Sequence, residues 1–169
     1  MEAMIEAYCK KLKIGKVFYQ DYKDIQAATH GEFLLELLKR ELDNRELVRK
    51  KRHLKAANFD LIKTFQDYSF ENIQIPATIT VDEIKKASFI GKKENLILYG
   101  PVGTGKSHLA TAVGVEACSQ GKRVKFFRTA ALVNQLTDAK AQGELRRFMR
   151  QVEKCDLLIC DEWGYIPFE

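Results

Sequence analysis

The stretch LILYGPVGTGKSHLATAV, residues 96–113, decides how the rest of this chain can be interpreted. An apolar run ends at Gly100, a glycine-rich turn follows, and an apolar helical pattern begins near Lys106. The eight residues from Gly100 to Ser107 match G-x-x-x-x-G-K-[ST] at every fixed position. Glycines let backbone amides gather around an anion, and a helix that starts there turns its free N–H groups toward that anion. The stretch therefore predicts a phosphate-binding loop between a strand and a helix.

Each polar residue of this loop has a task in binding ATP and Mg²⁺. The ammonium group of Lys106 neutralises the β- and γ-phosphates and so also assists phosphoryl transfer, while the Ser107 hydroxyl is a ligand for the metal ion. The alternative is a glycine-rich turn that binds no ligand. Considered by itself, the side chain of His108 is expected to have a structural role. We expect the nucleotide contacts to come from Gly100, Pro101, Val102, Gly103, Thr104, Gly105, Lys106, Ser107 and His108.

A second acidic motif completes the predicted site. The apolar run 157–160 is followed at once by Asp161 and Glu162. Ligands of open parallel sheets bind beyond the carboxyl ends of the strands, so this pair and the loop should lie at the same edge. We expect Asp161 to hold Mg²⁺, directly or through water, and Glu162 to polarise the attacking water as a general base. A solvated acidic pair is the alternative.

The segments around these motifs predict an α/β fold with a parallel sheet. Apolar runs at 95–100, 123–128 and 157–160 are typical of buried strands, and helical patterns at 106–120, 129–141 and 144–154 separate them. This order favours right-handed crossovers. Thr129 is expected to cap the helix that it opens. We assign residues 81–169 to a P-loop ATPase core, 66–80 to an extended linker, and 1–65 to a helical domain.

Two capping boxes mark helix starts before the core. Thr29 and Glu32 predict the start of a helix with leucines 34, 35, 38 and 42 on one face, extending to about residue 57. Thr80 and Glu83 predict a short helix that ends near Gly91. No internal repeat is found.

A basic segment, RELVRKKRHLK at residues 45–55, lies in the long predicted helix. Such a face can follow DNA phosphates without reading bases, although a solvated helix face is the equal alternative. The candidate DNA contacts are Arg45, Arg49, Lys50, Lys51, Arg52 and Lys55.

Composition narrows the protein class. The 169 residues carry a net charge of +5, and 46% of them are hydrophobic, as in an ordinary globular protein. No apolar run is long enough to span a bilayer, and the first residues do not resemble a signal peptide. The four cysteines form no CxxC pair, so reduced structural cysteines and a cytoplasmic location are expected.

The two motifs together resemble the IstB transposition helper ATPases of bacterial insertion sequences, which have an AAA+ core related to that of the DnaC and DnaI helicase loaders. The segment DEWGYIP, from Asp161 to Pro167, is the most discriminating: members have an acidic pair, a large apolar residue, then Gly-Tyr-hydrophobic-Pro. The resemblance implies ATP-dependent binding of double-stranded DNA, self-assembly on it, and delivery of a target site to a transposase. It favours the DNA interpretation of the basic segment.

The sequence departs from the family pattern at its carboxyl end. The pattern continues past the second motif with strands that carry a polar sensor residue and an arginine that acts on the neighbouring subunit's nucleotide, and this sequence ends at Glu169. We therefore expect an incomplete core at the carboxyl end, which makes hydrolysis by this chain alone uncertain. A replicative helicase loader, with the helicase as partner, and a non-catalytic ATP- or DNA-binding fragment remain alternatives.

Overall fold

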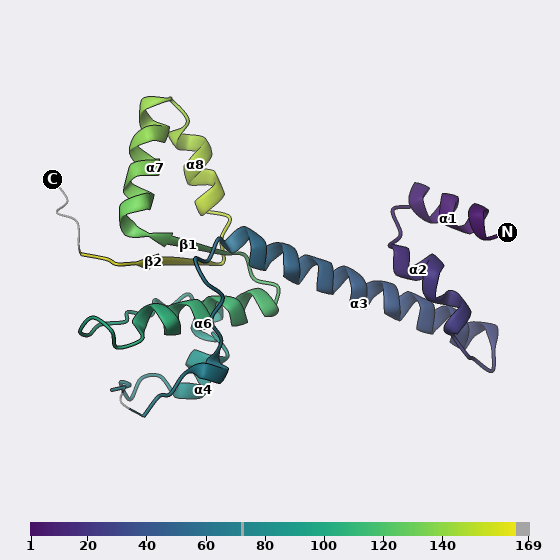
Figure 1. The fold of residues 1–169 in the computed structure, drawn as a ribbon, viewed down its shortest axis with the longest axis horizontal. Coiled ribbons are helices and arrows are strands. Elements are labelled where there is room, and N and C mark those ends of the chain that lie inside the picture. The colour runs from purple at the N-terminus through teal and green to yellow at the C-terminus, as the bar shows by residue number, and fades with distance from the viewer. Residues whose placement is uncertain (72, 165–169) are drawn as a thin grey trace. The chain divides into compact units, whose positions relative to one another are not determined.

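The computed structural model describes residues 1–71 and 73–164. The chain divides into two compact units, Met1–Arg49 and Lys50–Glu169. The first unit holds α1 (Glu2–Lys11), α2 (Lys16–Gln20), η1 (Asp21–Asp24) and the beginning of α3 (His30–Ala57). The second unit holds the end of α3 and the remaining elements (Figure 1): η2 (Phe65–Asp67), α4 (Val81–Lys85), α5 (Phe89–Lys92), α6 (Lys106–Ser119), β1 (Val124–Arg128), α7 (Thr129–Ala141), α8 (Leu145–Val152) and β2 (Leu157–Asp161).

The predicted start of α3 is confirmed. The Glu32 amide donates to Thr29 Oγ1 at 3.1 Å, and the Glu32 carboxylate accepts from the Thr29 amide at 3.2 Å. The face that carries leucines 34, 35, 38 and 42 is exposed, whereas Leu37 and Glu41 are buried. The burial of Glu41 is compensated by hydrogen bonds, since its Oε1 accepts from the Gly15 amide and from Arg45 Nε. Within the first unit, hydrogen bonds of charged side chains therefore join the segment around residues 13–15 to α3.

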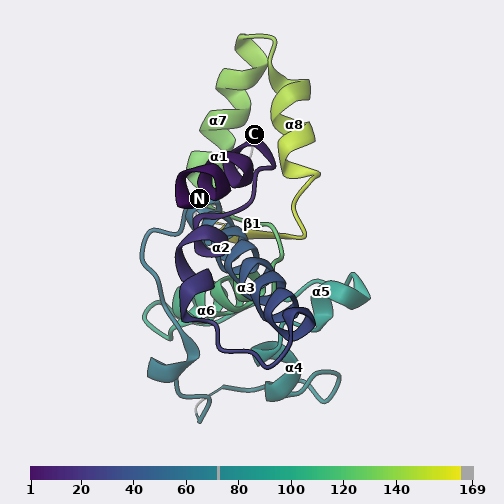
Figure 2. The ribbon, with the colours of Figure 1, turned by 90° about the vertical axis from the view of Figure 1, so that its right-hand side faces the viewer.

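The sheet of the second unit is parallel, as predicted, and its two described strands are β1 and β2. Val124 pairs with Leu157 and Arg128 with Asp161, so the carboxyl ends of both strands are level. One face of the sheet is covered by α6, and the other by the antiparallel helices α7 and α8, which run side by side in both views (Figures 1 and 2). This is the layered arrangement that strand–helix–strand order dictates.

The core of the second unit lies between α6 and the sheet. It contains Leu109 and Val113 of α6, Phe126 of β1 and Ile159 of β2. Gly114 makes this approach close, since an added Cβ would lie 2.7 Å from Ile159 Cδ1 and 2.8 Å from the Phe59 ring. Gly121, with φ of 80°, ends the helix region as predicted, and the Lys122 amide bonds back to the Ala117 carbonyl.

The prediction of a strand at 95–100 was wrong in the described part of the chain. Leu96 and Leu98 pack against the core, but Ile97 is 86% exposed and Tyr99 is 99% exposed. A strand in the interior of a sheet also needs hydrogen-bonded neighbouring strands, and neither described strand pairs with this segment. The side chains of Leu96 and Leu98 therefore face the core, while the backbone of this segment forms no hydrogen-bonded pairs with a described strand.

Three smaller predictions also meet the structure. The Thr80–Glu83 capping box is present, but the short helix expected to end near Gly91 is divided into α4 and α5 at Ala87, where φ is 49°. The stretch 66–80 has little regular structure, yet Tyr68, Phe70 and Ile75 pack against the core. The prediction that Thr129 caps its helix was wrong, because Arg128 is the N-cap residue of α7, and Thr129 is the first helical residue, whose hydroxyl donates to the Asp161 carbonyl. Within the described residues, no helix combines the length and apolarity that crossing a bilayer requires.

Candidate nucleotide-binding site

The loop from Gly100 to Ser107 has a backbone that only glycine adopts easily. Gly100, Gly103 and Gly105 have φ values of 151°, 83° and 85°. All three lie in the positive-φ region that disfavours residues with a Cβ. Gly105 is the residue before the first turn of α6, so the free amides of that turn face the loop. The predicted cradle is therefore supported by its local geometry.

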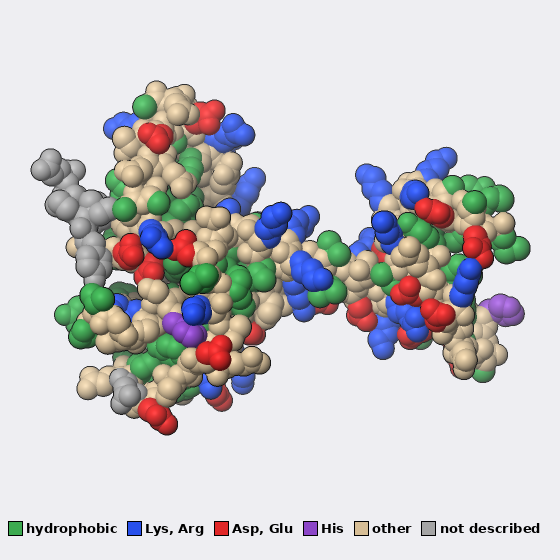
Figure 3. Space-filling model, in the orientation of Figure 1, with side chains coloured by type: hydrophobic (Ala, Val, Ile, Leu, Met, Phe, Trp, Pro, Cys, Tyr) green, Lys and Arg blue, Asp and Glu red, His purple; other side chains and the backbone are tan. Residues whose placement is uncertain are grey.

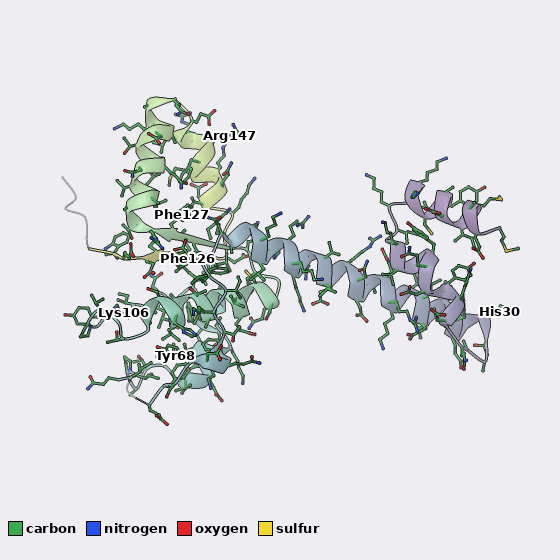
Figure 4. The ribbon with its side chains drawn as sticks, in the orientation of Figure 1. His30, Tyr68, Lys106, Phe126, Phe127 and Arg147 are labelled. Atoms are coloured by element: carbon green, nitrogen blue, oxygen red, sulfur yellow. The ribbon has the colours of Figure 1, made fainter. Side chains whose placement is uncertain are left out.

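Lys106 lies within this cradle (Figure 4). Its Nζ donates to the carbonyl oxygen of Gly100 at 2.8 Å and to that of Pro101 at 2.6 Å. Thr104 Oγ1 donates to the same Pro101 carbonyl at 2.9 Å. The lysine is thus held over the loop by the loop's own carbonyls, at the position from which its charge can meet phosphate oxygens.

An aromatic group from the linker packs on the loop, which the sequence analysis did not anticipate. A Cβ added to Gly105 would lie 3.1 Å from Tyr68 Cε2. The Tyr68 ring also lies 5.1 Å from the His108 ring, and His108 Nε2 is 2.9 Å from the carbonyl oxygen of Thr64. Burial raises the pKa of the Tyr68 hydroxyl. His108 therefore has a structural partner, and the linker forms one side of the loop.

The acidic pair lies at the same edge of the sheet as the loop. Strand β2 ends at Asp161, and α6 runs antiparallel to β2, so its amino-terminal end reaches the carboxyl edge of the strands (Figure 1). Asp161 Oδ1 accepts from the Glu162 amide at 3.0 Å, and Thr129 Oγ1 donates to the Asp161 carbonyl at 2.8 Å. Glu162 has φ of 58°, an uncommon value for a residue with a side chain. The backbone thus turns sharply where a catalytic base is expected.

Arg128 is a further charged residue at this edge that sequence analysis missed. It ends β1 directly beside Asp161, and its guanidinium pairs with Asp60 at 2.7 Å. Asp60, then Glu162 and Asp161, raise the pKa of Arg128. The strand register was the signal that could have identified it, because the last residue of 123–128 has to neighbour the end of 157–161.

The oxygen donors at this edge suit magnesium. Mg²⁺ is usually bound by one or two carboxylates together with phosphates and water, and not by an all-protein cage. Asp161 offers a carboxylate, and Ser107 offers an exposed hydroxyl on the first turn of α6. No cluster of three or more acidic, His or Cys ligands occurs among the described residues. The residues present therefore fit an ion shared with a nucleotide.

The basic segment lies along α3 and divides between the two units. Arg45 belongs to the first unit, where its guanidinium bonds to Glu41 Oε1 at 2.6 Å and to the Lys13 carbonyl at 2.9 Å. Arg49 ends that unit, and the second unit begins at Lys50. Three exposed basic residues, Lys51, Arg52 and Lys55, occupy the end of α3, over which Lys and Arg side chains gather in Figure 3.

A protein-family comparison decides the classification of the chain. The model of the family described as "IstB-like ATP binding protein" matches residues 12–169. The chain belongs to this family. It is therefore an IstB-like protein with a P-loop NTPase fold and an ATP-binding role, and the prediction from its motifs is confirmed at that level. The last part of the family segment, from Tyr165 onward, lies outside the described residues.

Curated relatives of this IstB-like protein come from insertion sequences. It is 30% identical over 174 residues to "Insertion sequence IS5376 putative ATP-binding protein" of Geobacillus stearothermophilus, covering 100% of this chain and 69% of the relative. It is 32% identical over 168 residues to the IS21 protein of that kind from Pseudomonas aeruginosa, covering 96% of this chain and 63% of the relative. The IS1162 counterpart of Pseudomonas fluorescens is 34% identical over 138 residues, covering 79% and 58%. The chain thus spans about three fifths of the length of these relatives.

Proposed function

We propose that this IstB-like protein is an ATP-dependent, DNA-associated helper in the transposition of an insertion sequence. The supporting observation is the loop of residues 100–107, which has three positive-φ glycines and a lysine bonded to its carbonyls, and which lies toward the same edge of the sheet as the end of β2 (Figure 1). The names of the relatives place ATP binding within insertion sequences. DNA binding, action with a transposase and assembly into a homo-oligomer extend the proposal to the whole protein.

The chemistry assigns one role to each group at the site. Loop amides and Lys106 bind the phosphates, and Ser107 and Asp161 would hold Mg²⁺, which would supply charge screening for the phosphate oxygens. Glu162 orients and polarises the attacking water as a general base. The hydrogen bonds from Thr129 and from the Glu162 amide fix the backbone and the carboxylate of Asp161, so that little reorganisation is needed during hydrolysis.

The DNA-binding part of the proposal rests on the exposed basic residues at the end of α3. Lys51 and Lys55 are four residues apart and so lie on one face of the helix, with Arg52 next to Lys51. Point charges of this kind contact phosphates and carry no base information. Binding is therefore expected to tolerate sequence changes in the DNA and to weaken steeply with salt.

Nucleotide binding and turnover can be tested separately on the purified chain. A fluorescent ATP analogue is titrated into wild type, Lys106→Ala and Glu162→Gln, and phosphate release is measured with and without duplex DNA. We expect Lys106→Ala to lose most nucleotide affinity, and Glu162→Gln to bind ATP without hydrolysing it. Lys122→Ala, beyond the other end of α6, is the matched control and should change neither. Wild-type affinity retained in Lys106→Ala would refute the loop assignment.

The same material distinguishes the alternatives. ATP binding without any turnover by the wild-type chain would favour the non-catalytic interpretation. Co-purification with the transposase of the same insertion sequence would support the helper function, whereas co-purification with a replicative helicase would favour a helicase loader. The resemblance of the segment 161–167 leans toward the transposase.

A further inference from the structure

The ion pair between Asp60 and Arg128 lies at the edge of the sheet where the acidic motif ends. Arg128 Nε donates to Asp60 Oδ2 at 2.8 Å, and a second guanidinium nitrogen lies 2.7 Å from the same oxygen. Asp60 comes from the loop that follows α3, so this contact joins two segments far apart in sequence. Both side chains are about half exposed, which makes the pair a poor candidate for a stabilising contact.

Arg128 has other anionic neighbours on its own face of the sheet. Phe126 and Ile159 are register partners, and both face α6, because Phe59 contacts Phe126 and, like Ile159, lies against Gly114. Side chains alternate along a strand, so Arg128 and Asp161 face α6 as well, on strands roughly 4.8 Å apart. The guanidinium is nevertheless paired with Asp60, not with the residue directly beside it.

This choice of partner has a consequence for Asp161. A guanidinium is a planar donor that matches a carboxylate in two parallel hydrogen bonds. If Arg128 paired with Asp161, it would occupy the oxygens that a metal ion needs, and it would place a positive charge next to the ion. Asp60 satisfies the guanidinium and removes this competition, which leaves Asp161 with the hydrogen bond from the Glu162 amide.

We propose that Asp60 is a positioning residue for the magnesium site, because it holds the Arg128 guanidinium off the carboxylates of Asp161 and Glu162. The inference rests on the proposed function of those two carboxylates. Asp60 follows the end of α3 by three residues, and Lys125 Nζ on β1 donates to the Ala56 carbonyl at 2.8 Å. The end of α3 is therefore bonded directly to β1, the strand that carries Arg128. This contact links the helix that carries the basic residues to the edge of the sheet where the metal site is proposed.

The test uses nucleotide affinity, so it does not require turnover. A fluorescent ATP analogue is titrated into the full chain with Mg²⁺ and again with a chelator, and the ratio of the two dissociation constants gives the magnesium-dependent gain. Asp60→Asn should reduce this gain roughly two- to five-fold, because Arg128 would then form an exposed ion pair with Asp161 that the metal ion has to break. Arg128→Gln should leave the gain unchanged or increase it. The double variant should behave like Arg128→Gln, because the defect of Asp60→Asn requires the arginine.

A purely structural ion pair predicts a different pattern. In that case Asp60→Asn and Arg128→Gln break the same contact and change the gain in the same direction, which would overturn the inference. The matched control is the Arg123–Asp156 pair, which closes the opposite edge of the same sheet at 3.2 Å, and its Asp156→Asn variant should keep the wild-type gain. A wild-type chain that binds the nucleotide without any magnesium-dependent gain refutes both the metal site and this inference. A chain that binds no nucleotide refutes the proposed function first.

Discussion

Replacement of Gly114 by alanine tests whether close packing of α6 on the sheet determines the stability of the nucleotide-binding unit. The new Cβ would lie 2.7 Å from Ile159 Cδ1 and 2.8 Å from two atoms of the Phe59 ring, all shorter than the separations that Cβ atoms tolerate. Overpacking of this kind costs about 1–3 kcal/mol. The better helix propensity of alanine returns only about 1 kcal/mol. We therefore expect a net loss of up to about 2 kcal/mol.

The measurement is a urea titration followed by circular dichroism, with Gly91→Ala as control. Gly91 is also helical, but an added Cβ there meets no atom within 4 Å, so that variant should be neutral or slightly more stable. Because the clash pushes α6 away from β2, the magnesium-dependent gain in nucleotide affinity should fall as well. A Gly114→Ala protein as stable as the Gly91→Ala control, each measured against wild type, would refute the packing argument.

Three further perturbations follow from contacts of the second unit. Gly105→Ala should destabilise the loop more than Gly103→Ala, since both have φ near 84° but only the Cβ at 105 meets the Tyr68 ring; thermal unfolding and nucleotide titration compare them. The pKa of Glu83 is lowered to about 2 by Lys92 and then by Thr80, so Glu83→Gln should lower the melting temperature at neutral pH, with the difference fading as pH falls from 4.5 toward 2. Neutralising the end of α3 should weaken DNA binding across sequences and flatten its salt dependence in fluorescence anisotropy, whereas an equal charge change elsewhere should not. The three test residues are Lys51, Arg52 and Lys55, and the three control residues are Lys86, Lys93 and Lys154.

Much of the site could be predicted from sequence because its features are local. The glycines of the loop, the first turn of α6 and the acids after β2 are set by neighbouring residues and by the rule that parallel strands end at one edge. Capping boxes at Thr29 and Thr80 are local in the same sense, and both were predicted correctly.

The features that sequence missed depend on contacts between distant segments. The run 95–100 has the composition of a buried strand, but a strand is defined by its neighbours, and neither described strand pairs with it. Four leucines of α3 share an exposed face, while the buried Glu41 bonds to Gly15 and Arg45, and the spacing of the leucines gives no sign of these bonds. Tyr68 lies 37 residues before Gly105 and Asp60 lies 68 residues before Arg128, and no short motif marks either of them.

The hydrogen bonds of Lys106 mean that nucleotide binding is an exchange of partners. Its ammonium already has two carbonyl acceptors, on Gly100 and Pro101, at 2.8 and 2.6 Å. Its third N–H reaches only Thr104 Oγ1, at 3.5 Å, so an incoming phosphate would replace this weak acceptor first, and the affinity would reflect the difference between a charged acceptor and a neutral one. The two bonds to the carbonyls also fix the position of the lysine relative to the loop before a nucleotide binds. Because the phosphate has to compete with acceptors that the protein itself supplies, we expect a triphosphate to be preferred over less charged anions.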